Sequence, residues 1–174
     1  MIKIAILVCV LFCVACELQE GTFTDIRDSK VYKTIKIGEQ VWFAENLNYE
    51  ADGSKCYENK PANCDKYGRL YSWKTAMKSC PDGWHLPSKA EWEVLMESVV
   101  GEKTENQFDF FALSGGYGYS SGFFYDLGNL SYWWSANEYG SYSASRKNIY
   151  YINEYADDDS YVKNILRSVR CVKK

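Results

Sequence analysis

The fold of this chain is decided by the stretch Cys80-Pro-Asp-Gly-Trp-His-Leu-Pro-Ser-Lys-Ala-Glu-Trp-Glu-Val-Leu95. Ser88 followed three residues later by Glu91 has the spacing of a capping box, in which each side chain bonds the backbone N–H of the other residue at a helix N-terminus. Pro87, just before it, ends an extended segment. We therefore predict a helix over Ser88–Val100, entered through a strand-to-helix corner that contains Trp84, His85 and Leu86.

Other motifs accompany this stretch in order along the chain: Gly38-Glu-Gln-Val-Trp42 with Glu45-Asn-Leu-Asn48, Tyr67-Gly-Arg-Leu-Tyr-Ser-Trp73, Trp133-Trp-Ser-Ala-Asn-Glu138 and Ser168-Val-Arg-Cys171. Together they resemble the Fibrobacter succinogenes major paralogous domain over residues 30–174. This resemblance assigns no biochemical function. It implies an α+β fold similar to C-type lectin and formylglycine-generating-enzyme-like domains, with two helices packed on short antiparallel strands and with long irregular loops.

The remaining elements are predicted from periodicity and from turn residues. We expect a hairpin of Lys30–Ile37 and Gln40–Phe43, a first helix over Tyr67–Lys78, a loop with short strands over Phe108–Ser131, strands at Tyr132–Ser135, Ala144–Tyr151 and Ser160–Val172, and an acidic turn at Asn153–Asp159.

Composition indicates a secreted single domain. The 174 residues are 17% aromatic, which favours short strands over a helical bundle. The net charge is −3 at pH 7, and the basic residues are not clustered. This distribution argues against nucleic acid as a partner.

The first 15 residues have the pattern of an export signal. Lys3 precedes an apolar run, Ile4–Val14, that is too short to span a membrane. Val14-Ala15-Cys16 then resembles a bacterial lipobox, which implies lipidation of Cys16, an anchor and tether over residues 16–29, and attachment to the cell envelope at the outer membrane. The alternative is cleavage by leader peptidase without a lipid, which would give a secreted protein.

Four cysteines remain beyond the leader and the anchor, and they allow three pairings: Cys56, Cys64, Cys80 and Cys171. We favour Cys56–Cys64, which closes a short loop, and Cys80–Cys171, which resembles the terminal-strand bridge of C-type lectin-like domains. A zinc site is the competing interpretation. The lack of a Cys-x-x-Cys pair and the export signal count against zinc.

Catalytic and metal-binding chemistry has little support in the sequence. His85 is the only histidine, and we interpret it as structural. An envelope enzyme that acts on glycans through an acid and base pair of carboxylates is the alternative function, but no motif selects the pair. Calcium could be held by Asp157-Asp158-Asp159 or near Asn137-Glu138, whereas a solvated acidic turn is the simpler interpretation, so we predict no metal site.

Aromatic residues separated by Gly and Ser over residues 115–125 resemble a binding paratope. The tyrosines predicted to contact a ligand are Tyr117, Tyr119, Tyr125, Tyr139 and Tyr142. The aromatic residues predicted to fill the core are Phe123, Phe124, Trp42, Trp73, Trp84, Trp92 and Trp134. Our hypothesis is a lipid-anchored, non-catalytic, lectin-like binding or structural module whose ligand is a carbohydrate or a protein.

Overall fold

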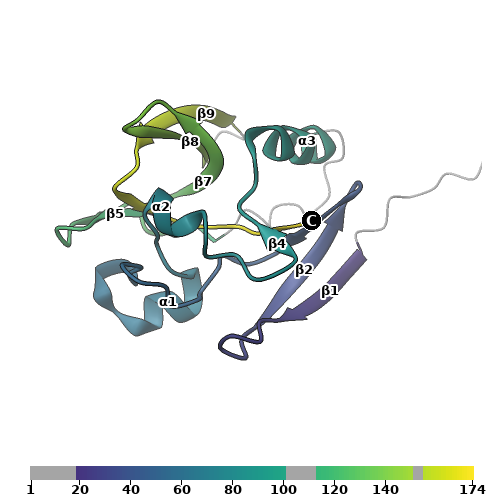
Figure 1. Cartoon of the computed structure of the whole chain (residues 1–174), viewed down its shortest axis with the longest axis horizontal. Helices are drawn as coiled ribbons and strands as arrows, with labels where there is room; N and C mark the ends of the chain where they lie inside the picture. Colours follow the sequence, from purple (N-terminus) through teal and green to yellow (C-terminus); the bar gives the residue numbers. More distant parts are fainter. Residues whose placement is uncertain (1–18, 101–112, 151–154) are drawn as a thin grey trace, which may run out of the picture.

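The computed structural model describes residues 19–100, 113–150 and 155–174, which form an α+β domain built mostly of short strands (Figure 1). The strands are β1 (Gln19–Thr24), β2 (Val31–Ile37), β3 (Gln40–Phe43), β4 (Trp84–His85), β5 (Tyr117–Tyr119), β6 (Phe124–Tyr125), β7 (Leu130–Tyr139), β8 (Ser143–Tyr150), β9 (Tyr155–Val162), β10 (Ile165–Arg167) and β11 (Val172–Lys173). The helices are α1 (Pro61–Tyr67), α2 (Trp73–Ala76) and α3 (Lys89–Val100), with a 3-10 turn, η1, at Tyr57–Asn59.

The strands form three sheets, with the orders β1-β2-β3-β11-β4, β10-β5-β6 and β7-β8-β9. In Figure 1, α3 and the β7-β8-β9 sheet lie along the upper edge, and α1 and β1 lie along the lower edge. The last strand, β11, lies between β3 and β4, where Val172 pairs with both Trp42 and His85. The C-terminal residues are therefore built into the first sheet, beside the predicted hairpin of β2 and β3.

Aromatic side chains fill the core. The ring of Phe43 stacks on Tyr32 with centroids 4.6 Å apart and contacts Trp84 at 4.4 Å. A second cluster surrounds Trp92, which lies 4.9 Å from Trp42 between ring centroids. The predicted core tryptophans are buried at positions 42, 84, 92 and 134, and Trp73 is partly buried against the same core.

The capping box forms as predicted. The backbone N–H of Ser88 donates to Glu91 Oε2 at 2.7 Å, and the N–H of Glu91 donates to Ser88 Oγ at 3.2 Å. The other carboxylate oxygen, Oε1, lies 2.7 Å from His85 Nε2. Burial alone would raise the pKa of Glu91, but the hydrogen bonds from Ser88 and His85 outweigh it and hold this pKa below its ordinary value. The imidazole of His85 thus joins β4 to the start of α3.

Both predicted disulfides are present in the structure. Cys56–Cys64 closes a short loop around η1 and α1, with a sequence separation of 8 residues. Cys80–Cys171 spans 91 residues and ties the segment before β4 to the segment before β11. The second bridge thus joins distant parts of the chain next to β11, an interior strand of the first sheet.

Asn46 is a buried polar centre that the sequence did not single out. Its Nδ2 donates to the backbone carbonyls of Tyr67 and Leu113, at 2.8 and 3.1 Å. Its Oδ1 accepts from Trp133 Nε1 at 2.8 Å and from Arg170 Nε at 3.0 Å. One amide therefore connects four segments that are far apart in the sequence.

The single helix predicted over Tyr67–Lys78 is wrong. The first helix, α1, ends at Tyr67, and Gly68 follows with φ +75°. Leu70 and Tyr71 then form bridges to Lys55 and Arg167, so this segment is extended. Only α2, whose N-terminus is capped by the Ser72 hydroxyl, is helical in the later part. The described residues therefore hold three α-helices where two were expected.

The tether expected over residues 16–29 is structured from Gln19 onward, because Gln19–Thr24 forms β1 and pairs along its length with β2. The following turn contains buried Asp25, which accepts from Arg27 N–H, Nε and Nη2 at 3.0, 2.9 and 2.6 Å. Burial alone would raise the pKa of Asp25, but the hydrogen bonds from Arg27 lower it below its ordinary value. The predicted leader and Cys16 lie outside the described residues.

Two expectations near the C-terminus are also corrected. The acidic turn predicted at Asn153–Asp159 is wrong in its later part, because Tyr155–Val162 is strand β9, paired with β8. The register sets Asp158 and Asp159 across from Lys147 and Arg146. The single strand expected over Ser160–Val172 is divided among the end of β9, β10 and the start of β11.

Candidate functional site

Three of the predicted ligand-contacting tyrosines lie on one face of the β10-β5-β6 sheet. Tyr117 pairs with Tyr125, and Tyr119 follows two residues after Tyr117, so the alternation of side chains along a strand places all three on the same side. The rings of Tyr117 and Tyr125 stack with centroids 5.3 Å apart, and Tyr119 meets Tyr117 edge-on at 5.9 Å. We call this set of three residues the tyrosine face.

The opposite side of the same sheet is buried and supports the tyrosine face. Phe124 packs against Tyr57 with ring centroids 5.1 Å apart, as part of a cluster that includes Leu166. A Cβ at Gly118 would lie 2.5 Å from the Phe124 ring, so only glycine lets this ring lie against β5. Lys55 Nζ also donates to the carbonyl of Ser120 at 3.0 Å, which fixes the turn between β5 and β6.

A buried arginine lies beside the tyrosine face. Arg167 is paired with Tyr117 in the register of β10 and β5, and its side chain is 1% exposed. Its guanidinium carbon lies 5.6 Å from the ring centroid of Tyr117, 4.9 Å from Tyr132 and 5.1 Å from Tyr161. Burial, with a smaller effect of nearby Arg146, lowers the pKa of Arg167 to about 9, so the guanidinium remains charged at neutral pH.

The tyrosine face combines apolar rings with neutral hydroxyl groups. Burial raises the pKa of Tyr117 and that of Tyr119, so both phenols keep their protons at neutral pH and can donate and accept hydrogen bonds. Tyr125 is 45% exposed. Exposed ring surface with a polar hydroxyl at its end suits a ligand that has both apolar and hydroxyl-bearing faces.

The other two predicted tyrosines lie elsewhere. Tyr139 and Tyr142 are 67% and 84% exposed at the hairpin between β7 and β8, where Lys163 Nζ donates to the carbonyls of Gly140 and Ser141. No ring contact within the described ranges joins them to the tyrosine face. The structure therefore brings together three of the five residues and leaves two on a separate hairpin.

Phe123, predicted to be in the core, is 65% exposed, which corrects that prediction. It sits in the turn between β5 and β6, next to inward-facing Phe124. Because adjacent positions of an extended chain point to opposite sides, two consecutive phenylalanines could not both face the core, and this alternation was the missed signal.

The residues considered for calcium have structural contacts. Asn137 Oδ1 accepts from the N–H of Lys89 at 2.6 Å, at the start of α3, and from Ser135 Oγ at 3.2 Å. Glu138 forms an ion pair with Lys163. No group of three potential ligands for a metal ion occurs within the part of the chain that the structure describes. The three aspartates at 157–159 lie along β9.

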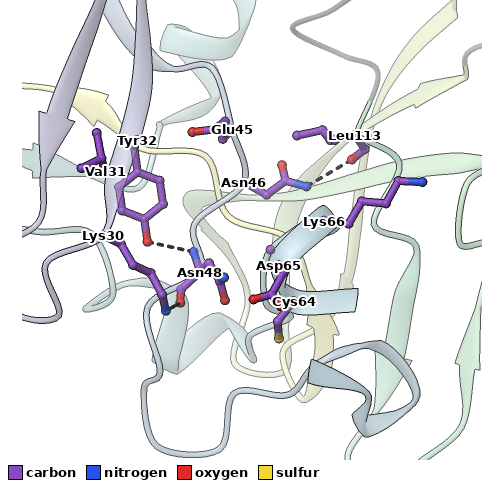
Figure 2. A pocket seen from close by; sticks show the side chains of 11 residues that line it. Lys30, Val31, Tyr32, Glu45, Asn46, Asn48, Cys64, Asp65, Lys66 and Leu113 are labelled. Atoms are coloured by element: carbon purple, nitrogen blue, oxygen red, sulfur yellow. Dashed lines mark hydrogen bonds between the residues drawn. The ribbon is translucent and has the colours of Figure 1, made fainter. Parts of the chain in front are cut away.

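A surface pocket of about 290 Å³ lies between β2 and α1. Figure 2 shows the side chains that line it. The Tyr32 hydroxyl accepts from the N–H of Asn48 at 3.1 Å, and Lys30 Nζ donates to the carbonyl of Asn48 at 2.5 Å. The Asn46 amide at the same pocket donates to Leu113, as described above. The polar groups drawn together here hold the segment after β3 in place, so the pocket is a weaker site candidate than the tyrosine face.

Comparison with known proteins gives a family assignment for part of the chain. None of the helices in the described ranges combines the length and apolar character that a membrane span requires. No curated protein and no solved structure matches the chain. Residues 35–109 match the model of one protein family. The matched segment begins in β2, includes the capping box and ends before the tyrosine face. The family is the Fibrobacter succinogenes major domain, which this chain therefore matches over residues 35–109.

Proposed function

We propose that this protein is an envelope-anchored, non-catalytic, C-type lectin-like module that binds carbohydrate on its tyrosine face. The observation that carries the proposal is the stacked pair of rings of Tyr117 and Tyr125, with Tyr119 edge-on beside them on the same side of a small sheet and with Tyr125 45% exposed. Aromatic rings offer the apolar faces of sugar rings a rigid surface, and their hydroxyl groups bond sugar hydroxyls.

The lectin-like part of the proposal is supported by the α+β organisation and by the Cys80–Cys171 bridge, which links the start of the core to its last strand. The anchoring is supported by the apolar leader and by Cys16 in a lipobox-like position. If Cys16 is lipidated, β1 begins only three residues later, so the domain is held close to the membrane surface. A ligand would then be a polymer at or outside that surface.

The proposal is tested by binding of the exported domain, residues 17–174, to a glycan array with and without calcium. Tyr125→Ala and Tyr119→Ala are each expected to weaken binding about 3- to 10-fold, the loss of one aromatic contact. Tyr139→Ala and Tyr142→Ala are matched controls, because they remove exposed tyrosines away from the tyrosine face.

Three results would contradict the proposal in different ways. An array with no bound glycan would exclude carbohydrate binding. Loss of binding in the Tyr142→Ala variant alone would move the site to the β7–β8 hairpin. Release of new reducing ends from a bound glycan would show an enzyme instead of a binding module.

A further inference from the structure

We infer that the tyrosine face selects acidic saccharides, those that carry carboxylate groups, and that Arg167 is the residue that determines this specificity. This inference rests on the proposed function and goes beyond it by naming the class of sugar. Its basis is a buried positive charge beside Tyr117, on the neighbouring strand β10.

The charge of Arg167 has no acidic partner among the residues that the structure describes. Its Nε and Nη1 atoms are buried and have no hydrogen-bond acceptor there. Buried guanidinium groups are ordinarily paired with a carboxylate, because an unpaired buried charge destabilises the fold. A protein that keeps such a group at a candidate site has a reason for it beyond stability.

Aromatic rings take the place of that carboxylate. Besides the three tyrosine contacts given above, the guanidinium carbon lies 5.3 Å from the ring centroid of Trp134. Ring faces attract a cation but carry no net charge, so they leave its positive charge uncancelled. Since the side chain is 1% exposed, solvent and salt screen this charge less than they screen a surface lysine.

Two other charges border the same rings. Arg146 lies over Tyr161, with its guanidinium carbon 4.7 Å from the ring centroid. Asp126 accepts a hydrogen bond from the Tyr132 hydroxyl at 3.0 Å. The Asp126 carboxylate is hydrogen-bonded to the Tyr132 phenol and forms no ion pair with Arg167. Its negative charge therefore reduces the positive potential of the arginine without cancelling it.

Arg167 gives the tyrosine face a positive potential on a protein whose net charge is −3. A neutral sugar gains nothing from that potential, whereas a uronic acid gains Coulomb attraction in addition to ring stacking. Because the guanidinium carbon of Arg167 lies 5.6 Å from the ring centroid of Tyr117, on the neighbouring strand, a carboxylated sugar stacked on Tyr117 and Tyr125 would lie within the field of this charge. The geometry therefore favours a carboxylated polysaccharide over a neutral one with the same backbone.

The test compares oligogalacturonates with the same oligomers after methyl esterification, which removes the charge and keeps the sugar, and glucuronoxylan with unsubstituted xylan. Binding of residues 17–174 is measured by titration calorimetry at low and at high salt. We expect at least 10-fold tighter binding of the acidic member of one pair at low salt, and a smaller ratio at high salt.

Variants connect the preference to the charge. Arg167→Met should lower the ratio of acidic to neutral affinity to below 3-fold, and Arg167→Lys should retain more of it. Asp126→Asn removes the opposing charge and should raise the ratio. Circular dichroism checks that each variant is folded. If Arg167→Met does not fold, the salt dependence and Asp126→Asn still decide the question.

Failure of the acidic preference and failure of the proposed function would give different results. Equal affinity for both members of each pair, or binding only to neutral glycans, would overturn the acidic preference and leave carbohydrate binding intact. A ratio that Arg167→Met leaves unchanged would overturn the role of this arginine. Absence of any bound glycan on the array would overturn the proposed function itself.

Discussion

Removal of the Cys80–Cys171 bridge should destabilise the domain far more than removal of Cys56–Cys64. In the chain-entropy model, a bridge stabilises by restricting the unfolded chain, and the effect grows with the logarithm of the loop length. The separations of 91 and 8 residues give about 4.6 and about 2.5 kcal/mol at 25 °C. The expected difference between the two variants is about 2 kcal/mol.

The two double variants are Cys80→Ala with Cys171→Ala, and Cys56→Ala with Cys64→Ala. They are well matched, because each removes one bridge and each includes one buried sulfur position, Cys171 or Cys64. Urea unfolding of both is followed by tryptophan fluorescence, which reports the buried core, and by far-ultraviolet circular dichroism. The free energies are compared with each other as well as with the wild type.

The result that would refute the reasoning is an equal loss in the two variants, or a greater loss when the short loop is opened. Either outcome would mean that native packing around the sulfur atoms, and not the freedom of the unfolded chain, determines how much a bridge stabilises this domain. Reduction of the wild type with dithiothreitol should reproduce at least the loss seen for the long bridge.

Three further perturbations have expected outcomes. Glu91→Gln should lower the free energy of urea unfolding by about 1 kcal/mol through the loss of the charged capping group, whereas Glu93→Gln on the surface of the same helix should lower it by under about 0.5 kcal/mol. Because the folded-state pKa of Glu91 is lowered, its contribution is present above the unfolded pKa of about 4.3 and is lost as the pH falls. The stabilities of the wild type and Glu91→Gln should therefore converge near pH 3, and a difference that does not change with pH would contradict the assignment. Asn46→Ala should lower the free energy of unfolding by at least about 3 kcal/mol, because it leaves buried groups without their hydrogen-bonding partner. Asn48→Ala keeps its backbone contacts and should lower it by under about 1 kcal/mol. Equal losses of stability in thermal unfolding would exclude a central role for Asn46. Gly118→Ala should lower the free energy of unfolding by about 1–3 kcal/mol and should weaken glycan binding, because the added methyl group displaces Phe124. Ser120→Ala is the control. An unchanged melting temperature of Gly118→Ala would show that the Phe124 ring can move aside freely.

The features that could be predicted from the sequence are those set by short-range chemistry. Ser88 and Glu91 cap a helix whatever surrounds them, and Gly38 lets the chain turn between β2 and β3. The cysteine pairing was also predicted correctly, from a loop length and a resemblance. Tyr117, Tyr119 and Tyr125 were selected as ligand contacts from composition, and their common face follows from strand alternation.

The features that the sequence failed to predict depend on contacts between distant segments. Leu70, Trp73 and Ala76 have helical spacing, yet Tyr71 exchanges hydrogen bonds with Arg167 and draws the segment into an extended form. The polar stretch Gln19–Thr24 has little periodicity of its own and becomes a strand because β2 offers it a partner. Arg167 carried no sequence signal as a site residue, since the rings around it come from three other strands, β5, β7 and β9.

The position of β11 has a consequence for when the protein can fold. Val172 and Lys173 occupy an interior place in the first sheet, and the N–H of Lys174 donates to the carbonyl of Gly83. The sheet therefore cannot close until these residues have left the ribosome, and Cys80 must wait equally long for its partner. If the protein is exported as proposed above, this delay keeps the sheet open through synthesis and translocation, and the sheet and the long bridge are completed together in an oxidising compartment.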